Sequence, residues 1–286
     1  MSNLILGIDA GNYRTKVAGE YGVLSYSSAI CDWFQRDIVE SFGDDDMEFS
    51  IGERKGFAGS IAEYEDIYGG EAMYGDSKAH DDTKVKVLLG IYRYMKKYGI
   101  SNQNLSIIVG QPISQHVQKD KEFIQKMLQG YQEFTVNGEH QAVWIDKIGV
   151  VAEGSGAFWS DPSDGIVRIV DVGSGTVNLA TIINKNHVNT GSETLNFGME
   201  TGRNKRDLDS MVRGIIRGTT RLQWQREDNV LVCGGIARDV TELIISHFPN
   251  AKVIQPILKG NGRVSVVEST YANAVGFYQI AKGVFG

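Results

Sequence analysis

The sequence predicts an α/β protein built from two related halves. A strand, an Asp-x-Gly turn and a second strand occur in this order twice, at Asp9 and at Asp171, about half the chain apart. A repeat at this distance indicates an internal duplication. The chain has 286 residues, and at roughly 150 residues per domain this length predicts two domains. Its 34 glycines lie beside strand-like segments, which is typical of tight turns rather than of flexible linkers.

The composition argues against several classes of protein. With 29 Lys and Arg against 35 Asp and Glu, the net charge is −6, which is unfavourable for a protein that coats nucleic acid. No run approaches the roughly 18 apolar residues of a membrane span, and no basic leader precedes an apolar segment. We therefore expect a cytoplasmic protein without direct membrane contact. Cys31 and Cys233 lie far apart in the sequence and are expected to be reduced core thiols.

The first half begins with a hairpin. A short apolar strand over 4–8 ends at Asp9, a glycine-containing turn follows, and a second strand covers about 13–18. Further on, apolar residues at helical spacing, such as Val85 and Leu88, predict a helix over 82–98. The other segments predicted here are a mixed, partly mobile inserted subdomain over 31–80, a strand over 105–109, a loop over 110–114 and a helix over 118–129.

The second half repeats the hairpin, with strands over 166–170 and 177–183 on either side of the turn 171–176. Before this hairpin, residues 149–159 are typical of a strand end that leads into a helix. Later segments are a buried strand over 229–233, an amphipathic helix over 239–248 and a last helix over 269–281. The last helix contains Ala272, Ala274 and Gly276, and such small residues favour close packing rather than ligand contact.

The two hairpins together form a candidate phosphate-binding site. Glycine lets the backbone approach a ligand and adopt positive φ, so the backbone N–H groups of each turn could surround phosphate oxygens. Asp9 and Asp171 would hold Mg²⁺ through water, because Mg²⁺ keeps several waters and prefers a few carboxylates with phosphate oxygens. Lys16, Ser174 and Thr176 would contact the terminal phosphates. The alternative is two ordinary hairpins that each have an aspartate in the turn.

Five segments resemble the motifs of the actin, heat-shock-70 and sugar-kinase superfamily, and they occur in family order. Residues 8–16 (IDAGNYRTK) look like its first phosphate loop, residues 171–176 (DVGSGT) like its second, and residues 232–237 (VCGGIA) like its adenosine motif. Residues 149–158 and 271–281 resemble the two connecting helices that cross at the hinge. Together the five motifs span nearly the whole chain.

The resemblance implies an actin-like two-domain ATPase fold with duplicated ribonuclease-H-like halves. Domain I would cover 1–150 and include the small subdomain 31–80. Domain II would cover 151–286, and its C-terminal helix would return to domain I. The base-side segment 184–228 is short, which implies that the second small subdomain is reduced.

Within the superfamily, Lys16, which follows the first aspartate by seven residues, resembles the lysine with which actins touch the phosphates. The short chain and residues 110–114, which read GQPIS, resemble the bacterial plasmid-segregating actins of the ParM and AlfA type. The shortness of the base-side segment favours the AlfA type among these actins. In ParM-like proteins the longer segment covers the base, so its shortness here leaves recognition of the base open. The resemblance therefore implies ATP as the expected nucleotide and GTP as the alternative.

The resemblance also implies the residues of a nucleotide site. Glu153 matches the water-positioning residue of the first connecting helix, where a carboxylate would orient or deprotonate the attacking water. Otherwise it is a glutamate that stabilises the start of that helix. The expected catalytic residues are Glu153, Asp9 and Asp171, and both aspartates are the expected Mg²⁺ ligands through water. The expected nucleotide-binding residues are Gly11, Asn12, Tyr13, Lys16, Gly173, Ser174, Gly175, Thr176, Gly234, Gly235 and Ile236.

The implied function is a Mg-dependent ATPase that polymerises into filaments and segregates plasmid DNA. Its expected ligands are Mg²⁺ and ATP. Its expected partners are further copies of the chain and a DNA-binding adaptor bound to a plasmid centromere. Two alternatives stay open: a small-molecule kinase of the same superfamily, and a membrane-associated scaffold that does not hydrolyse nucleotide. No acceptor-facing aspartate supports the first, and no amphipathic terminal helix supports the second.

One further segment is locally basic on this acidic chain. Residues 202–227 contain three acidic residues and seven basic ones, namely Arg203, Lys205, Arg206, Arg213, Arg217, Arg221 and Arg226. This excess is compatible with contact to the acidic residues 44–48 of a neighbouring copy, with nucleotide contact, or with an adaptor–DNA complex. The alternative is a solvated helix face. The five histidines show no metal-ligand spacing.

Overall fold

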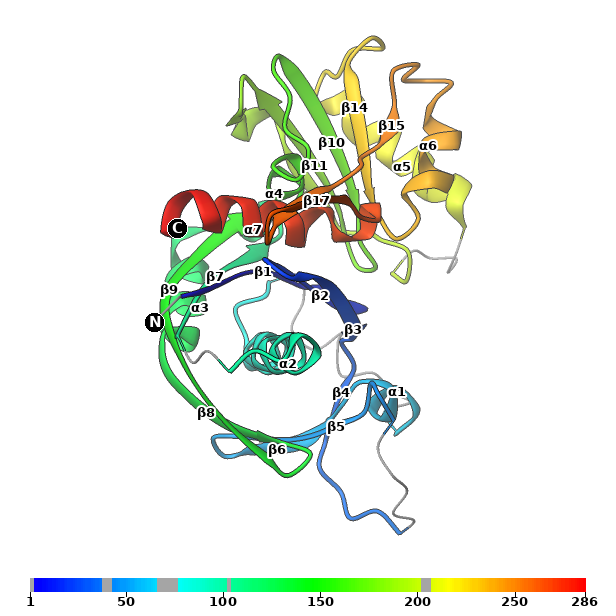
Figure 1. The fold of residues 1–286 in the computed structure, drawn as a ribbon. Coiled ribbons are helices and arrows are strands. Elements are labelled where there is room, and N and C mark those ends of the chain that lie inside the picture. The colour runs from blue at the N-terminus through cyan, green and yellow to red at the C-terminus, as the bar shows by residue number, and fades with distance from the viewer. Residues whose placement is uncertain (1–2, 38–42, 66–76, 102–103, 202–206) are drawn as a thin grey trace.

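The computed structural model describes residues 3–37, 43–65, 77–101, 104–201 and 207–286, and these form two α/β lobes (Figure 1). Lobe I contains a nine-stranded sheet in the order β3-β2-β1-β7-β9-β8-β5-β6-β4. Its strands are β1 Leu4–Ala10, β2 Arg14–Gly19, β3 Gly22–Ser27, β4 Ile30–Asp32, β5 Met47–Ile51, β6 Arg54–Ala58, β7 Asn104–Gln111, β8 Gly130–Val136 and β9 Glu139–Ala152. Its helices are α1 Ser60–Glu65, α2 Asp81–Tyr98 and α3 Gln118–Leu128.

Lobe II contains a sheet in the order β12-β11-β10-β14-β15, with β13 paired to β11. Its strands are β10 Ile166–Val172, β11 Val177–Ile183, β12 Asn186–His187, β13 Glu193–Leu195, β14 Asn229–Gly234 and β15 Lys252–Val253. Its helices are α4 Ser155–Phe158, α5 Leu208–Arg221 and α6 Ala237–Ile244. A separate hairpin of β16 (Ile257–Gly260) and β17 (Arg263–Val266) precedes the last helix, α7 (Ala272–Phe285).

Helix α2 lies inside the curve of the lobe I sheet (Figure 1). Its leucines and isoleucine, and also Tyr94, are fully buried, so almost all sides of the helix contact apolar groups. Asp81 and Asp82 in its first turn and Lys96 and Lys97 in its last turn match the direction of the helix dipole. Gly99 ends it in the left-handed conformation at φ 63°. The packing of α2 against β1 holds the C-terminal end of that strand, where Asp9 lies, in place.

The strand connections confirm the predicted duplication. In lobe I, β1 pairs antiparallel with β2 and parallel with β7. In lobe II, β10 pairs antiparallel with β11 and parallel with β14. Each lobe therefore has the same hairpin beside the same kind of parallel strand, and this equivalence places Asp9 and Asp171 at corresponding positions.

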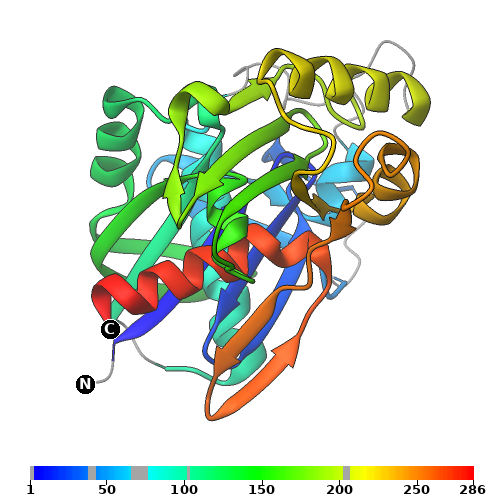
Figure 2. The same cartoon turned by 90° about the horizontal axis from the view of Figure 1, so that it is seen from above.

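Helix α7 connects the lobes by returning to lobe I, where it crosses the strands of that sheet (Figure 2). A Cβ on Gly7 of β1 would lie 2.2 Å from the carbonyl oxygen of Ala274, so the helix backbone rests directly on the strand. Ala272, Ala274 and Gly276 are all packed against neighbouring elements, which confirms the close packing predicted for these small residues. Helix α5 and helix α6 cover one face of the lobe II sheet.

The structure corrects several element boundaries. Gly110 and Gln111 belong to β7 rather than to a loop. The helix predicted over 239–248 runs from Ala237 to Ile244, and the last helix begins at Ala272 after a short 3-10 turn and continues to Phe285. Neither Cys31 nor Cys233 forms a disulfide, as predicted, but only Cys233 is a buried core residue, whereas Cys31 is half-buried.

The described part of the inserted segment 31–80 joins the lobe I sheet. The strand β5 pairs with β8, so this part of the chain extends that sheet. The ladder continues because Phe49 and Ile51 alternate inward with the apolar residues of β8. The predicted mobility falls partly on 38–42 and 66–76, outside the described residues.

Candidate functional site

A cavity of about 550 Å³ lies between the lobes, within the size range of small-ligand sites. All fourteen residues predicted for the nucleotide site line it. They are Asp9, Gly11, Asn12, Tyr13, Lys16, Glu153, Asp171, Gly173, Ser174, Gly175, Thr176, Gly234, Gly235 and Ile236. The two hairpins and the loop after β14 thus face one space, whereas their chemical roles stay predictions.

Asp9, at the end of β1, is 6% exposed and faces Lys16 directly across the first hairpin. The Lys16 ammonium lies 3.3 Å from Asp9 Oδ2, and the Lys78 ammonium lies 3.3 Å from Asp9 Oδ1. Burial by itself raises the pKa of Asp9, but the two ammonium groups outweigh it and hold the pKa below its ordinary value. Asp9 is therefore a carboxylate at neutral pH.

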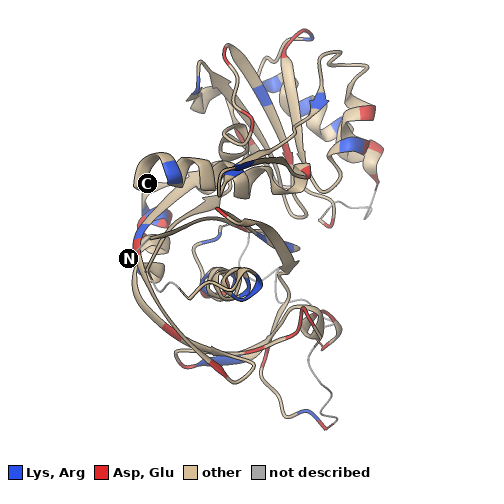
Figure 3. Cartoon of the chain, viewed as in Figure 1, with Lys and Arg blue, Asp and Glu red and all other residues tan. Residues whose placement is uncertain are grey.

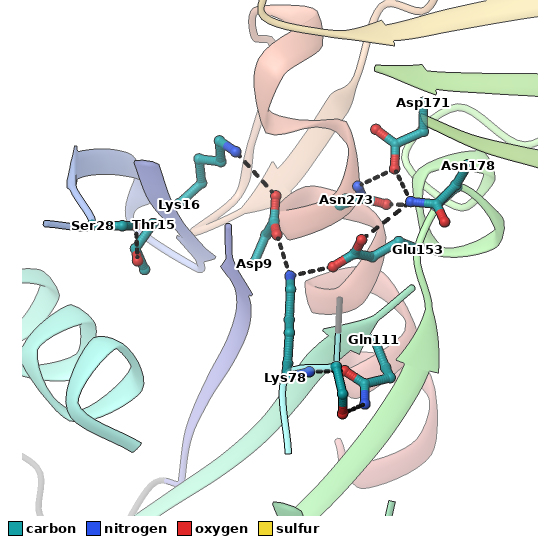
Figure 4. A network of polar contacts seen from close by, with 12 residues as sticks. Asp9, Thr15, Lys16, Ser28, Lys78, Gln111, Glu153, Asp171, Asn178 and Asn273 are labelled. Atoms are coloured by element: carbon teal, nitrogen blue, oxygen red, sulfur yellow. Dashed lines mark hydrogen bonds and ion pairs between the residues drawn. The ribbon is translucent and has the colours of Figure 1, made fainter. Parts of the chain in front are cut away.

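Asp171 occupies the matching place in lobe II and is 7% exposed. Its Oδ2 accepts hydrogen bonds from Asn273 Nδ2 at 2.9 Å and from Asn178 Nδ2 at 3.5 Å (Figure 4). Burial raises the pKa of Asp171, the Asn273 hydrogen bond lowers it, and the negative charge of Asp9 raises it again. The Cys233 thiol donates to Asp171 Oδ1 at 3.4 Å, and burial raises its pKa, which fits a packed strand residue rather than a nucleophile.

The duplication makes Asn178 the counterpart of Lys16. Asn178 stands opposite Asp171 in the β10–β11 register, just as Lys16 stands opposite Asp9 in the β1–β2 register. The strand position opposite the aspartate therefore carries a different functional group in each half. Lobe I presents a cation to the cavity, and lobe II presents an amide.

The glycines of the two turns serve the site in a way that differs from the prediction. Gly11, Gly173 and Gly175 do not have positive φ. Instead, a Cβ on Gly11 would lie 2.8 Å from the carbonyl oxygen of Arg14, and one on Gly173 would lie 3.0 Å from that of Thr176. The turns need glycine because backbone approaches backbone within the hairpin.

Glu153 lies before α4 rather than inside it, which corrects the predicted place in the helix. It follows the end of β9, and Gly154, at φ 73°, separates it from the helix start. Its N–H donates to the carbonyl oxygen of Gln111 at 2.9 Å, and Asn178 Nδ2 donates to its Oε2 at 3.2 Å. Burial raises its pKa, although the Lys78 ammonium lowers it. The turn directs the carboxylate into the cavity.

Several polar residues of the site were missed in the sequence. Lys78, in the segment before α2, forms ion pairs with both Asp9 and Glu153 (Figure 4). Asn178 and Asn273 bridge Glu153, Asp171 and the backbone of Gly154. Asn178 stands seven residues after Asp171, the spacing of Lys16 from Asp9, and that repeat could have found it.

The loop after β14 lines the cavity and is predicted to contact the sugar and α-phosphate. Gly234 has φ 111°, and a Cβ on it would lie 2.1 Å from the carbonyl oxygen of Val172. A Cβ on Gly235 would meet nothing within 4 Å, so this residue faces open space. Met199 and Glu200, from the loop between β13 and α5, also line the cavity, and their N–H groups donate to the carbonyl oxygens of Gly173 and Ser174.

The donor set fits a hydrated Mg²⁺ rather than a metal held directly by the protein. Among the residues that the structure describes, no cluster of three His, Cys, Asp or Glu could hold a metal ion. Asp9 and Asp171 present one carboxylate from each lobe, and Mg²⁺ accepts few protein ligands when water and phosphate oxygens supply the rest.

Fold and site together define a protein of two duplicated α/β lobes with a polar ligand cavity between them. Comparison with family models matches residues 7–156 to the N-terminal domain of actin-like proteins, which is more than half of the chain. The chain therefore belongs to the actin-like protein family. A comparison with curated proteins gave no match.

Similar solved structures confirm the actin-like fold over the whole chain. An AlfA filament bound to AMPPNP matches with a TM-score of 0.80 and 21% identity, covering 100% of both chains. The AlfA filament from B. subtilis plasmid pLS32 matches with a TM-score of 0.77 and 20% identity, covering 96% of this chain and 97% of that one. Apo psk41 ParM matches with a TM-score of 0.73 and 16% identity, covering 99% and 98%. Of the helices described, none is long and apolar enough to cross a membrane.

Proposed function

We propose that this chain is a cytoplasmic, nucleotide-dependent actin that assembles into filaments, hydrolyses ATP and supports plasmid DNA segregation. The cavity between the two lobes carries the proposal, because one site there contacts both hairpins. The likeness to an AlfA filament bound to AMPPNP supports nucleotide binding and self-association. A DNA-binding adaptor would connect the filament to a plasmid centromere.

The proposed domains are 1–150 and 151–286, with the C-terminal helix packed on the first. The hairpin glycines, Asn12, Ser174 and Thr176 would surround the phosphates with N–H and O–H donors. The loop from Gly234 to Ile236 would contact the sugar and α-phosphate. Asp9 and Asp171 would hold hydrated Mg²⁺, which neutralises charge on the phosphates when bound.

Hydrolysis would be organised by Glu153. Its buried carboxylate points into the cavity and receives a hydrogen bond from Asn178, so its orientation is fixed from lobe II. It would accept a proton from the attacking water or orient that water toward the γ-phosphate. A nucleotide that contacts both lobes favours the closed arrangement, and loss of the γ-phosphate would loosen it.

The test is right-angle light scattering of the purified chain after addition of Mg-ATP, with phosphate release measured on the same sample. We expect scattering to rise and filaments to be visible by electron microscopy, whereas Mg-ADP gives no sustained rise. Mg-GTP tests the alternative nucleotide. A flat scattering trace would contradict the filament proposal, and ATP turnover without assembly would favour the small-molecule kinase.

A further inference from the structure

Lys78 is a buried lysine between two carboxylates that line the cavity. It is 6% exposed, its ammonium lies 3.3 Å from Asp9 Oδ1, and it pairs with Glu153 Oε1. It comes from the segment just before α2, and it lines the same cavity as the two hairpins. Figure 4 shows its side chain extended toward the two carboxylates.

The position of Lys78 is fixed through its backbone. Its N–H donates to Gln111 Oε1 at 2.9 Å, and Gln111 Nε2 donates to Ser77 Oγ at 3.2 Å. Gln111 Nε2 also donates to Asp120 Oδ2 at 3.3 Å, and Ser77 Oγ donates to the same oxygen at 2.7 Å. Elements β7 and α3 therefore hold the base of the side chain, while its four-carbon stem leaves the ammonium able to change partners.

The charges of the cavity show why a second lysine is needed there. Three buried carboxylates, Asp9, Glu153 and Asp171, line its inner end, and each would repel a phosphate group. Lys16 and Lys78 contact opposite oxygens of Asp9. Only Lys78 also reaches Glu153, so among the described contacts it is the cation that lies between the two residues.

We propose that Lys78 is a further catalytic residue of this site, whose ammonium moves from Asp9 and Glu153 to the γ-phosphate when ATP binds. The inference rests on the proposed ATPase function. The movement leaves the Glu153 carboxylate available to water and places a positive charge beside the phosphoryl group. Without nucleotide, the same ammonium offsets part of the negative charge of the two carboxylates.

In the proposed reaction, the water oxygen forms a bond to the γ-phosphorus. The bond from that phosphorus to the β–γ bridging oxygen breaks, and its electron pair stays on ADP. One proton of the water passes to the Glu153 carboxylate and then to solvent. Lys78 donates to the γ-phosphoryl oxygens throughout and stabilises the charge on them in the transition state.

The experiment compares Lys78→Gln with wild type and with Lys16→Gln, below the concentration at which the chain assembles. Single-turnover phosphate release and the dissociation constants of Mg-ATP and Mg-ADP are measured. We expect Lys78→Gln to reduce the rate by about 10²- to 10³-fold. It should also reduce the preference for ATP over ADP by roughly tenfold and retain ADP binding, because ADP lacks the group that Lys78 contacts. Lys16→Gln should weaken both nucleotides.

Each result has a distinct meaning. If Lys78→Gln keeps the wild-type rate, or weakens ATP and ADP equally, Lys78 has only a structural role and the inference is wrong. If wild type releases no phosphate from ATP, the proposed ATPase function fails first. Circular dichroism shows whether Lys78→Gln is folded.

A second measurement needs no variant and so decides the question if Lys78→Gln does not fold. Adenosine diphosphopyridoxal carries an amine-reactive aldehyde where ATP has its γ-phosphate. After reduction with borohydride and peptide mapping of the wild-type chain, we expect the label on Lys78 and protection by Mg-ATP. Labelling of Lys16 alone would overturn the assignment.

Discussion

Gly276 of α7 lies directly on Gly156 of α4: a Cβ on Gly276 would be 1.8 Å from the carbonyl oxygen of Gly156. The contact is between backbones, so no side-chain movement can relieve an added methyl group. Gly156 in turn packs on Phe277, where a Cβ would meet the ring at 2.1 Å. The two connecting helices therefore cross at two glycines, between the lobes and beside the turn that carries Glu153.

This contact predicts a large loss of stability for Gly276→Ala. The methyl group would force the two helices apart, at a cost of about 3 kcal/mol in the free energy of unfolding. Gly283→Ala is the matched control, because Gly283 lies in the same helix and a Cβ there meets nothing within 4 Å. That control should be neutral or stabilising by up to about 1 kcal/mol. Urea denaturation measures both, and equal stabilities would contradict the crossing.

The loop after β14 offers a second matched pair of substitutions. Gly234→Ala would combine φ 111° with a clash against the carbonyl oxygen of Val172, so it should destabilise the fold. Gly235→Ala meets no protein atom and should change the free energy of unfolding by less than about 0.5 kcal/mol. If the backbone of Gly235 contacts the nucleotide, the same variant should raise the dissociation constant of ATP about tenfold. Calorimetry that finds unchanged ATP binding in Gly235→Ala would remove this residue from the site.

The sequence predicted the duplicated hairpins well because each one combines a strand pattern, an aspartate and a glycine within ten residues. Asp9 and Asp171 are therefore visible as a pair without any structure. Lys78 was not predictable in this way. It belongs to a segment without strong periodicity, and only the pairing of β7 with β1 and β9 brings it between Asp9 and Glu153.

Contacts between residues far apart in the chain account for the other features that the sequence did not predict. The described part of 31–80 contains short strands, and the pairing of β5 with β8 joins residues more than eighty positions apart in the chain. Local patterns carry no information about such a partner. Asn273 lies in the last helix, where the small residues beside it predict close packing and nothing marks a polar role, yet its amide hydrogen-bonds with Asp171 and with the backbone N–H of Gly154.

Glu153→Gln tests the proposed role in hydrolysis. The amide keeps the size of the side chain but cannot accept the proton of water, so phosphate release should fall by about 10²- to 10⁴-fold. Nucleotide binding and ATP-dependent assembly should remain, because neither needs the proton transfer. Filaments of this variant should therefore persist longer after Mg-ATP is added. Unchanged phosphate release would show that Glu153 is not the residue that activates water.

The basic segment before and within α5 is only partly within the described residues: Arg203, Lys205 and Arg206 lie outside them. Arg213 and Arg217 are exposed on one face of α5, while Met211 and Ile215 are buried on the other. Figure 3 shows Lys and Arg positions in blue on the helices of lobe II. Arg221 already pairs with Glu193 at 2.8 Å.

The acidic residues 44–48, which are one candidate partner of this face in a neighbouring copy, already have contacts within their own chain. Asp45 pairs with Arg93, and Asp46 accepts a hydrogen bond from the N–H of Ile61.

If α5 contacts a neighbouring copy in the filament, reversing the charges of its two exposed arginines should impair assembly. Arg213→Glu with Arg217→Glu would place like charges against any acidic partner, which costs several kcal/mol at an interface. We expect the critical concentration for assembly to rise at least about tenfold, with the dissociation constant of ATP unchanged because neither arginine lines the cavity. Lys119→Glu with Lys126→Glu is the control, since both lysines are exposed on α3 of the other lobe. Sedimentation at several protein concentrations measures the effect, and normal assembly of the α5 variant would mean that this face is solvated in the filament.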